Sequence, residues 1–298
     1  MKLHEAGQLL GNQLKAIYTG SEASNIAALV LEVLTGLTST ERIMQKDLLL
    51  TTGQLAQLDQ YTKQLLQHEP VQYVLQKAWF YGLELYVDPN VLIPRPETEE
   101  LVHWIVRDVR LMGKDVFEST SQRADGTTEL KILDIGTGSG CIALALKKSM
   151  PRSEVWGCDL SDEALNVARR NGSSLDIRVD FQSVDFLDAS QQKHLPTVDI
   201  IVSNPPYIPL KDQSSMHPNV LLHEPHTALF VPDEDPLLFY KALASFGKLR
   251  LHSPGAIYME IHEDLGDAVL KLFQSEGYTD VSLKKDMQGK NRMTKAEL

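Results

Sequence analysis

The chain has 298 residues, of which 43% are hydrophobic and 23% are charged, a composition typical of a globular protein with a sizeable core. Its 29 basic and 40 acidic residues give a net charge of −11, which argues against tight binding of long duplex nucleic acid through many phosphate contacts. Two cysteines exclude a disulfide scaffold, and the absence of a long apolar run or a signal-peptide pattern predicts a cytoplasmic protein without membrane contact.

The length favours two domains, and the first of them, residues 1–75, has helical periodicity. Apolar residues recur at helical spacing over 3–18, 21–34 and 55–66, and Ser21 and Thr51 are candidate caps for two of these helices. No glycine-rich loop and no metal-ligand spacing occur in this part of the sequence. We therefore expect a small all-α helical bundle that serves packing or substrate docking.

The pattern changes at residues 76–95, where we expect a β-hairpin linker. Residues 79–87 are rich in aromatic and apolar side chains and are followed by the turn sequence Asp88-Pro89-Asn90. Helical periodicity returns over 97–109, and the polar stretch 112–129 predicts a loop.

Strands and helices alternate from residue 131 onward. The predicted strands are 132–135, 154–158, 177–181, 198–202, 256–261 and 279–283. The predicted helices are 142–148, 163–170, 237–251 and 265–275. Such alternation predicts a mostly parallel sheet that helices cover on both faces, so residues 96–298 are expected to form an α/β, doubly wound, Rossmann-like domain.

A glycine-rich loop follows the first of these strands, with Gly136, Gly138 and Gly140 at alternate positions. Glycine lets the backbone pass close to a ligand, and the start of the next helix offers unpaired N–H groups. The G-x-G-x-G spacing differs from the G-x-G-x-x-G of dinucleotide sites. With Asp134 at the end of the strand, the loop resembles motif I of S-adenosylmethionine-dependent methyltransferases and is favoured over an ordinary strand–helix turn.

Acidic residues also follow the next two predicted strands. The Asp159 carboxylate can accept hydrogen bonds from two ribose hydroxyls, although NAD enzymes share this feature and the residue could instead cap the next helix. Asp185 and Phe186 could bind the adenine amino group and pack on its ring, or form an ordinary loop.

The sequence Asn204-Pro205-Pro206-Tyr207 comes directly after the apolar strand 198–202. In a doubly wound sheet this fourth strand lies beside the first, so we expect Asn204 to face the glycine-rich loop. The prolines stiffen the loop and donate no N–H group. The Asn204 side-chain oxygen and the Pro205 carbonyl can then accept both protons of a planar –NH2 group, and Tyr207 can stack on the flat group that carries it.

This arrangement suits methyl transfer to a planar nitrogen. An amide or aromatic amine nitrogen is a poor nucleophile because its lone pair is delocalised. Two acceptors hold the nitrogen against a sulfonium methyl group and stabilise the positive charge that develops on it, so no general base is needed before attack. We therefore predict that these four residues are catalytic, in preference to a merely rigid proline turn.

On these motifs the chain resembles the peptide chain release factor N5-glutamine methyltransferases, the PrmC/HemK family, over nearly its whole length. The most specific segment is Ile-Pro-Arg-Pro-Glu-Thr-Glu at 93–99. Further shared segments are 69–74, the glycine-rich loop, 204–208, Glu224-Pro225, Ala228-Leu229, Asp286, Gly289, Asn291 and Arg292. Two departures are His223, where an aromatic or aliphatic residue is common, and six residues beyond Arg292, which suggest a shortened last strand.

The resemblance implies a class I methyltransferase domain that transfers a methyl group from S-adenosylmethionine to the N5 atom of the glutamine in the Gly-Gly-Gln motif of class-1 release factors, leaving S-adenosylhomocysteine. It assigns cofactor binding to Gly136, Thr137, Gly138, Ser139, Gly140, Asp159, Asp185, Phe186 and Asn204. It assigns substrate binding to Asn204, Pro205, Pro206, Tyr207, Arg95, Pro96, Glu97 and Thr98.

Three alternatives stay open at this point. An N6-adenine methyltransferase would use the same four residues on a flipped base, and a related enzyme would methylate glutamine in a ribosomal protein. A binding module that has kept the fold without activity is a third, which the intact motifs disfavour. The charge and the 93–99 segment favour a release factor, and we expect a monomer without stable nucleic-acid binding.

His217, His223 and His226 lie close together in the sequence, but no cysteine accompanies them and their spacing matches no zinc site. We expect no metal.

Overall fold

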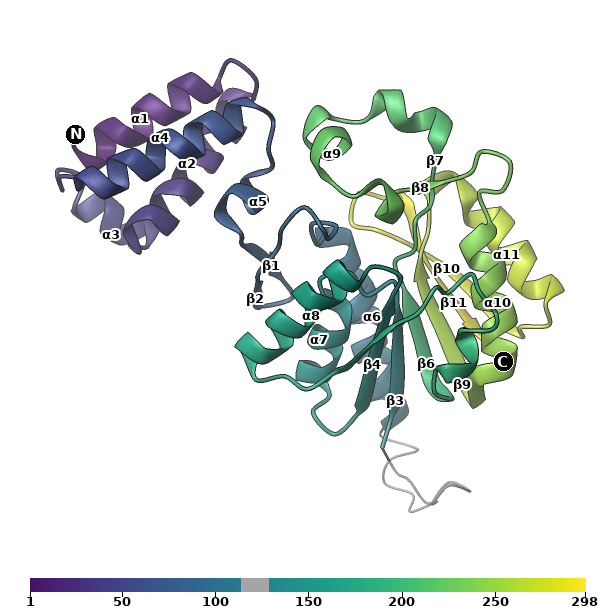
Figure 1. Cartoon of the computed structure of the whole chain (residues 1–298). Coiled ribbons are helices and arrows are strands. Elements are labelled where there is room, and N and C mark those ends of the chain that lie inside the picture. The colour runs from purple at the N-terminus through teal and green to yellow at the C-terminus, as the bar shows by residue number, and fades with distance from the viewer. Residues whose placement is uncertain (114–128) are drawn as a thin grey trace. The chain divides into compact units, whose positions relative to one another are not determined.

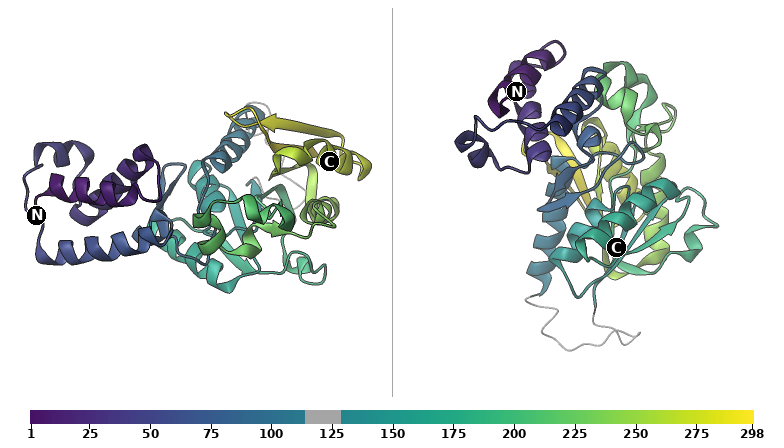
Figure 2. Two further views of the ribbon diagram at one scale, coloured as in Figure 1. Left: turned by 90° about the horizontal axis from the view of Figure 1, so that it is seen from above. Right: turned by 60° about the vertical axis from the view of Figure 1, so that its left-hand side comes forward.

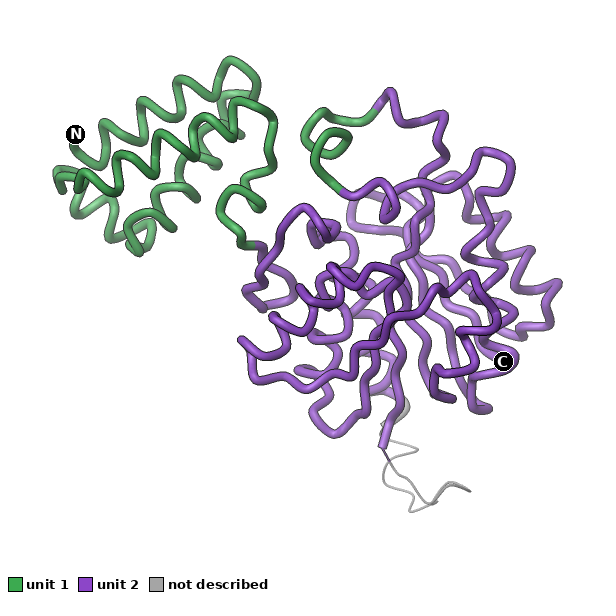
Figure 3. The backbone as a smooth tube through the Cα atoms, in the orientation of Figure 1, with its two compact units in different colours: residues 1–77, 216–224 green, residues 78–215, 225–298 purple. Residues whose placement is uncertain are grey.

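The structure, a computed structural model, describes residues 1–113 and 129–298, so most of the predicted loop 112–129 lies outside the described residues. The chain divides into two compact units (Figures 1 and 3). Unit 1 consists of residues 1–77 and 216–224, and unit 2 consists of residues 78–215 and 225–298. The chain therefore passes from one unit to the other at three places.

Unit 1 is a helical bundle in which the apolar stripes of its helices face one another. Its helices are α1 (Leu3–Leu14), α2 (Gly20–Thr35), α3 (Ser39–Met44), α4 (Thr52–Leu66), α5 (Val71–Leu75) and α9 (Pro218–His223). Helices α1, α2 and α4 pack side by side (Figure 2) around Leu10, Leu14, Val30 and Leu65. This core is the main source of stability of the unit, because burying each large aliphatic side chain contributes about 1.5–3 kcal/mol.

Side chains at the starts of α2 and α4 test the predicted caps. Thr51 caps α4 as predicted, and its hydroxyl accepts a hydrogen bond from the Gln54 N–H. The predicted cap of α2 is wrong. Its cap is Thr19, whose hydroxyl accepts from the Glu22 N–H, and Ser21 lies inside the first turn. Thr19 and Ser21 lie two positions apart and both residue types cap helices, so the sequence alone does not choose between them.

Residues 216–224 belong to unit 1 although 138 residues separate them from the rest of it. The Asn219 side-chain amide donates to the Tyr18 hydroxyl at 2.9 Å. The His223 Nε2 atom lies 3.1 Å from the Gln67 carbonyl oxygen. The His217 side chain caps α9. Two of the three clustered histidines therefore have structural contacts in the helical unit.

Unit 2 contains a seven-stranded sheet in the order β10-β11-β9-β6-β3-β4-β5. All pairs are parallel except those that β11 makes with β9 and β10. The strands are β3 (Lys131–Ile135), β4 (Glu154–Asp159), β5 (Asp180–Ser183), β6 (Val198–Ser203), β9 (Leu251–Glu260), β10 (Asp280–Lys285) and β11 (Asn291–Glu297). The doubly wound α/β fold is confirmed, and β6 lies beside β3 as expected.

Helices cover both faces of this sheet (Figure 1). One face carries α6 (Pro96–Gly113), α7 (Cys141–Ser149) and α8 (Asp162–Leu175), and the other carries α10 (Leu238–Arg250) and α11 (Gly266–Ser275). Each face has its own apolar core. None of the helices among the described residues is both long and apolar enough to cross a membrane.

Two smaller strand pairs lie outside the main sheet. The predicted hairpin is confirmed as β1 (Ala78–Phe80) and β2 (Leu83–Leu85), which pair antiparallel. The other pair is parallel and consists of β7 (Ile208–Pro209) and β8 (Phe230–Val231). Both pairs belong to unit 2.

Several predicted boundaries in unit 2 are wrong. The helix predicted at 163–170 continues to Leu175, and the strand predicted at 256–261 already begins at Leu251. The third strand begins at Asp180 rather than 177, because the apolar residues before it follow the helix end at Asp176. Helix α10 ends at Arg250, and Leu251 already starts β9. The last strand is not shortened, since β11 pairs with β10 on one side and β9 on the other.

The register of the parallel strands aligns their carboxyl ends. Ile135 of β3 pairs with Cys158 of β4 and Ser203 of β6, and Ser203 pairs with Met259 of β9. The four residues that follow these in sequence therefore come together at one edge of the sheet. They are Gly136, Asp159, Asn204 and Glu260.

Asn171 of α8 joins the segment after the hairpin to the glycine-rich loop. Its side-chain oxygen accepts from the Tyr86 N–H at 2.7 Å, and its amide donates to the carbonyl oxygens of Tyr86 and Ser139 at 3.0 Å each. The Arg170 guanidinium lies 3.4 Å above the centre of the Tyr86 ring. These contacts fix Tyr86 against the loop.

We expect Asn171→Ala to lower the free energy of unfolding by about 2–3 kcal/mol, because Asn171 is buried and three backbone groups lose their partner. Urea denaturation measures the change. Asn166→Ala, at an exposed position of the same helix, is the control and should change stability by less than about 0.5 kcal/mol. Equal effects of the two substitutions would contradict this account.

Candidate active site

A cavity of about 360 Å³ opens at the carboxyl ends of the parallel strands, where ligands bind in doubly wound sheets. Eight of the residues predicted for the site line it: Gly136, Gly138, Asp159, Asp185, Phe186, Asn204, Pro205 and Pro206. The cavity also has lining residues that were not predicted for the site, including 89–92, Pro225, Thr227, Ala228 and Phe239. The turn sequence at 88–90 could have pointed to residues 89–92, and the Glu224-Pro225 segment could have pointed to Pro225. No pattern in the sequence pointed to Phe239.

The glycine-rich loop approaches the cavity through its backbone. Gly136 and Gly138 have φ angles of +72° and +54°, which side chains with L chirality rarely adopt, and a Cβ atom on either would meet open space. The N–H groups of Gly136 and Thr137 donate to the Cys158 carbonyl oxygen at 2.9 Å each. Thr137, Ser139 and Gly140 do not line the cavity and instead shape the loop beneath it.

Asp134 is buried at the end of β3 and supports this loop. Its Oδ2 atom accepts from the Thr137 hydroxyl at 2.6 Å and from the Ala143 N–H at 3.2 Å. Its Oδ1 atom is buried and has no hydrogen-bond partner among the described residues. Burial raises the pKa of this carboxyl to about 7.

Asp159 is the last residue of β4, and both of its carboxylate oxygens face backbone donors. The Gly138 N–H donates to Oδ2 at 2.9 Å, and the Ser161 N–H donates to Oδ1 at 3.0 Å. Each oxygen keeps a second lone pair that can accept from a ligand. Burial raises the pKa of Asp159, and the two backbone donors oppose this rise. The cap of the following helix is Ser161, which leaves Asp159 free of that task.

Asp185 and Phe186 also line the cavity. The Asp185 Oδ1 atom accepts from the Leu187 N–H at 3.0 Å, which turns the chain sharply after β5. Phe186 packs edge to face on Phe246, with ring centres 5.3 Å apart. This contact holds the Phe186 ring in the cavity wall.

The Asn204 side chain is held from behind by a chain of hydrogen bonds. Its Nδ2 atom donates to the Thr98 hydroxyl oxygen at 3.2 Å, and that hydroxyl donates to the Glu260 Oε2 atom at 2.7 Å. The Tyr207 hydroxyl donates to the other oxygen of Glu260, Oε1, at 2.8 Å. Tyr207 is half-buried and does not line the cavity.

Glu260, which sequence reasoning missed, connects these residues. It is 1% exposed, and burial raises the pKa of its carboxyl while Thr98, Tyr207 and Arg292 oppose the rise. Arg292 donates from Nε to the Asp286 Oδ2 atom at 3.2 Å. The only signal in the sequence was a lone carboxylate at the end of an apolar run, Ala-Ile-Tyr-Met-Glu-Ile.

The other members of the 93–99 segment lie outside the cavity wall. Pro96 is exposed at the start of α6, and Glu97 accepts a hydrogen bond from the Gln288 side chain at 3.3 Å. The Arg95 carbonyl oxygen accepts from the Thr98 N–H at 3.1 Å, which closes the first turn of the helix. Substrate contact by Arg95, Pro96, Glu97 and Thr98 stays a prediction.

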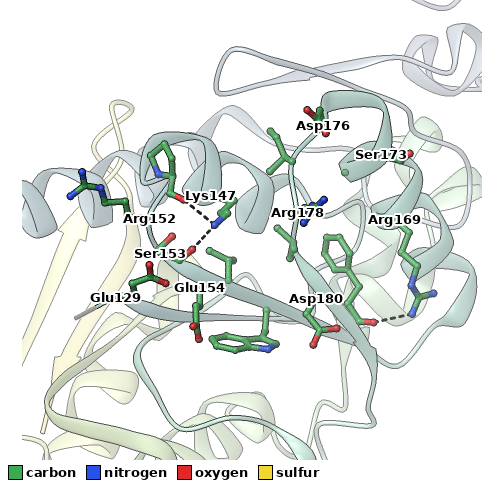
Figure 4. Close-up of a pocket in the computed structure, with 17 residues that line it drawn as sticks. Glu129, Lys147, Arg152, Ser153, Glu154, Arg169, Ser173, Asp176, Arg178 and Asp180 are labelled. Atoms are coloured by element: carbon green, nitrogen blue, oxygen red, sulfur yellow. Dashed lines mark hydrogen bonds between the residues drawn. The ribbon is translucent and has the colours of Figure 1, made fainter. Parts of the chain in front are cut away.

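A second, larger hollow of about 910 Å³ lies at the amino ends of β4 and β5 (Figure 4). Two of its basic side chains already have partners: Lys147 donates to the carbonyl oxygens of Pro151 and Ser153, and Arg169 donates to that of Phe181. Acidic and basic side chains alternate around it, which favours no single ligand charge. The cavity at the carboxyl ends is therefore the candidate site.

No group of three metal-ligating side chains occurs within residues 1–113 and 129–298. His226, the third clustered histidine, belongs to unit 2 and packs edge to face on Phe230 with ring centres 5.3 Å apart.

Comparison with known proteins gives two family matches. Residues 5–75 match the family described as the PrmC N-terminal domain, and residues 115–230 match the family described as the Methyltransferase small domain. Among solved structures, the hMettl16 catalytic domain in complex with an RNA hairpin has a TM-score of 0.53 at 16% identity, covering 83% of this chain and 82% of that chain. This likeness concerns the fold alone.

Curated relatives extend over nearly the whole chain. A release factor glutamine methyltransferase from Flavobacterium psychrophilum is 38% identical over 95% of this chain and 94% of its own length. Relatives of the same name from Bacteroides thetaiotaomicron and Streptococcus pneumoniae are 38% and 39% identical, covering 95% and 96% of both chains respectively. Since the identity extends through the helical unit and the candidate site alike, the chain belongs to the release factor glutamine methyltransferase family.

Proposed function

We propose that the protein transfers a methyl group from S-adenosylmethionine to the N5 atom of the glutamine in the Gly-Gly-Gln motif of a class-1 peptide chain release factor. The observation that carries this proposal is the placement of Asn204 and Pro205 in one cavity with Gly136, Gly138 and Asp159. The acceptor groups and the glycine-rich loop thus share one space. A cytoplasmic, monomeric enzyme without stable nucleic-acid binding is part of the same proposal.

The residues around the cavity fit S-adenosylmethionine. Asp134 does not itself line the cavity, but it supports the glycine-rich loop that does, and its buried carboxylate oxygen without a partner among the described residues suits the ammonium group. The Asp159 oxygens suit the ribose hydroxyls, and Asp185 and Phe186 suit the adenine. Gly136 and Gly138 have no side chains, so they leave room for the part of the cofactor that joins its ammonium group to its ribose. Bound there, the cofactor supplies an electrophilic methyl group on its sulfonium.

Asn204 and Pro205 would act on the acceptor. The Asn204 Oδ1 atom and the Pro205 carbonyl oxygen can accept the two N–H protons of the glutamine amide, which aims its nitrogen at the methyl group. As the nitrogen becomes positive, both hydrogen bonds strengthen, so they stabilise the transition state more than the bound substrate. Proton loss follows methylation, when the nitrogen is strongly acidic.

The same pair of acceptors would also suit the exocyclic amine of adenine or a glutamine of a ribosomal protein. Purified protein with radiolabelled S-adenosylmethionine tests the three together, with a release factor, a ribosomal protein mixture and unmodified DNA as acceptors. We expect label in the release factor, and its loss when the motif glutamine is replaced. Label in DNA and none in the release factor would overturn the proposal.

We expect Asn204→Ala to reduce the rate of methyl transfer at least 100-fold, because one of the two acceptors of the amide is lost. The dissociation constant of S-adenosylhomocysteine, measured by calorimetry, should change less than threefold. Asn166→Ala, which is exposed and outside the cavity, is the matched control. Near-normal turnover by Asn204→Ala would contradict the assigned role.

Asp134 makes cofactor affinity depend on pH. Its pKa of about 7 means that the carboxyl becomes protonated below that pH and loses its attraction for an ammonium group. We therefore expect the affinity for S-adenosylhomocysteine to fall by about tenfold or more between pH 7.5 and pH 5.5. In Asp134→Asn, affinity should be weaker at pH 7.5 and most of the dependence should be gone. An unchanged slope in that variant would argue against the assignment.

We propose further that the helical unit, predicted as residues 1–75, docks the release factor. In support, Ile43, Met44 and Leu49 expose 73%, 79% and 67% of their surface there. Single exposed apolar residues are common, whereas exposed apolar residues that gather on one surface mark an interaction site.

Replacing Ile43 and Met44 by serine should raise the KM for the release factor about tenfold, because their apolar contact is lost on docking. The KM for a short peptide with the Gly-Gly-Gln sequence should not change, since the peptide carries only the motif that enters the cavity and lacks the rest of the release factor. Steady-state kinetics with both acceptors checks this. An equal rise for both acceptors would contradict a docking role.

A further inference from the structure

We infer that Glu260 is a positioning residue: acting through Thr98, it fixes which end of the Asn204 side-chain amide faces the methyl acceptor. The inference rests on the proposed function and deepens it, since it explains how the site selects a neutral –NH2 group. It follows from the directions of three hydrogen bonds among buried and half-buried side chains.

The first step is at the Glu260 carboxylate, which accepts two hydroxyl hydrogens. Oε2 accepts from Thr98 and Oε1 accepts from Tyr207, at 2.7 and 2.8 Å. A carboxylate offers acceptors only, so both hydroxyls must point their hydrogens at it. Glu260 is 1% exposed and Thr98 is 2% exposed, so water does not compete readily for either group.

The second step is at Thr98. A hydroxyl has one hydrogen, and here it is used on Glu260, so the Thr98 oxygen can only accept from a third group. The nearest polar atom of Asn204 lies 3.2 Å away, and only the –NH2 end of that amide can donate. The reverse orientation would bring two acceptor oxygens together.

The third step concerns the cavity. With Nδ2 committed to Thr98, Oδ1 is the end of Asn204 that is left for a ligand. Next to the Pro205 carbonyl, it makes a pair of acceptors that matches the two hydrogens of an amide. With the opposite orientation, Asn204 would present a donor, which matches a carboxylate and repels an –NH2 group. Glu260 therefore selects glutamine over its deamidated form, glutamate.

The charge on Glu260 is supported by Arg292. Burial disfavours the charged carboxylate and raises its pKa, but the Arg292 guanidinium lowers it and is itself oriented by Asp286. This gives a role to the Asp286–Arg292 segment at the end of the chain, which the proposed function alone does not use. The turn that carries it also contacts the first turns of α6, where the Met287 N–H donates to Glu100 at 3.1 Å.

Two substitutions at Thr98 test the relay. Thr98→Val keeps the shape of the side chain but removes the hydroxyl, so nothing distinguishes the two ends of the Asn204 amide. Thr98→Ser keeps the hydroxyl and should restore the relay. In single-turnover assays with the release factor, we expect a 10- to 100-fold lower rate for Thr98→Val and less than threefold for Thr98→Ser, with S-adenosylhomocysteine affinity unchanged.

To distinguish a positioning role of Thr98 from a structural one, the rate of methyl transfer is also measured for Thr98→Val combined with Asn204→Ala. If Thr98 acts through Asn204, the substitution should change the residual rate of Asn204→Ala less than threefold. A further 10-fold loss in that background, or equal losses for the valine and serine variants, would overturn the inference. If Thr98→Val shows no melting transition, Thr98→Ala takes its place with the same expectation.

Glu260→Gln gives the second measurement. In glutamine an –NH2 group, which can only donate, replaces one of the two carboxylate oxygens, so Thr98 and Tyr207 no longer each face an acceptor. The rate should fall at least fivefold, and a normal rate would contradict the relay. Failure of the proposed function is seen separately, as a wild-type enzyme that does not label the release factor. Failure of this inference is seen as an active wild type whose rate Thr98→Val leaves unchanged.

Discussion

The candidate site depends on the parallel pairing of four strands in the order β9-β6-β3-β4. This pairing places Gly136, Asp159, Asn204 and Glu260 in consecutive rows at one edge of the sheet, although the sequence spreads them over 125 positions. Backbone groups at this edge lack partners within the sheet, and the polar side chains that gather there both satisfy them and remain available to ligands. The cavity, the glycine-rich loop and the hydrogen-bond chain behind Asn204 all follow from this alignment.

The alignment has a thermodynamic cost. Asp134, Asp159 and Glu260 are carboxyl groups whose pKa burial raises above ordinary values. An acid with a raised pKa binds more protons when folded than when unfolded, so its contribution to stability decreases as the pH rises from its ordinary pKa toward the raised one. Wherever these groups are ionised, the protein carries unfavourable buried charge at this edge of the sheet. The cofactor of the proposed function is cationic and carries hydroxyl groups, so its binding would offset part of that cost and stabilise the fold.

Local patterns in the sequence predicted much of this organisation. The alternation of strands and helices gave the doubly wound fold, and the glycines at 136–140 and the segment 204–207 marked the loops that meet at the cavity. Glu260 could not be found in the same way, because its significance depends on the register of β9 against β6, which no local pattern encodes. Residues 216–224 were missed for a related reason: their partners Tyr18 and Gln67 are more than 150 positions away. The strand at Asp180 was displaced because an apolar stretch alone does not distinguish a loop from the strand it precedes.

The division of unit 1 into two stretches of chain has one more consequence. Residues 216–224 pack on the helical unit, and the very next residue, Pro225, lines the cavity together with Thr227 and Ala228. The chain thus enters and leaves this part of unit 1 at 215–216 and 224–225, in addition to the connection after Lys77, and the crossing at 224–225 leads directly to a residue that lines the cavity. For this reason, the helical unit cannot be removed by truncation without affecting unit 2. Deleting residues 1–77 would strip α9 of its packing partners and release the loop that forms one side of the active site, so loss of activity on truncation would not by itself be evidence for a docking role.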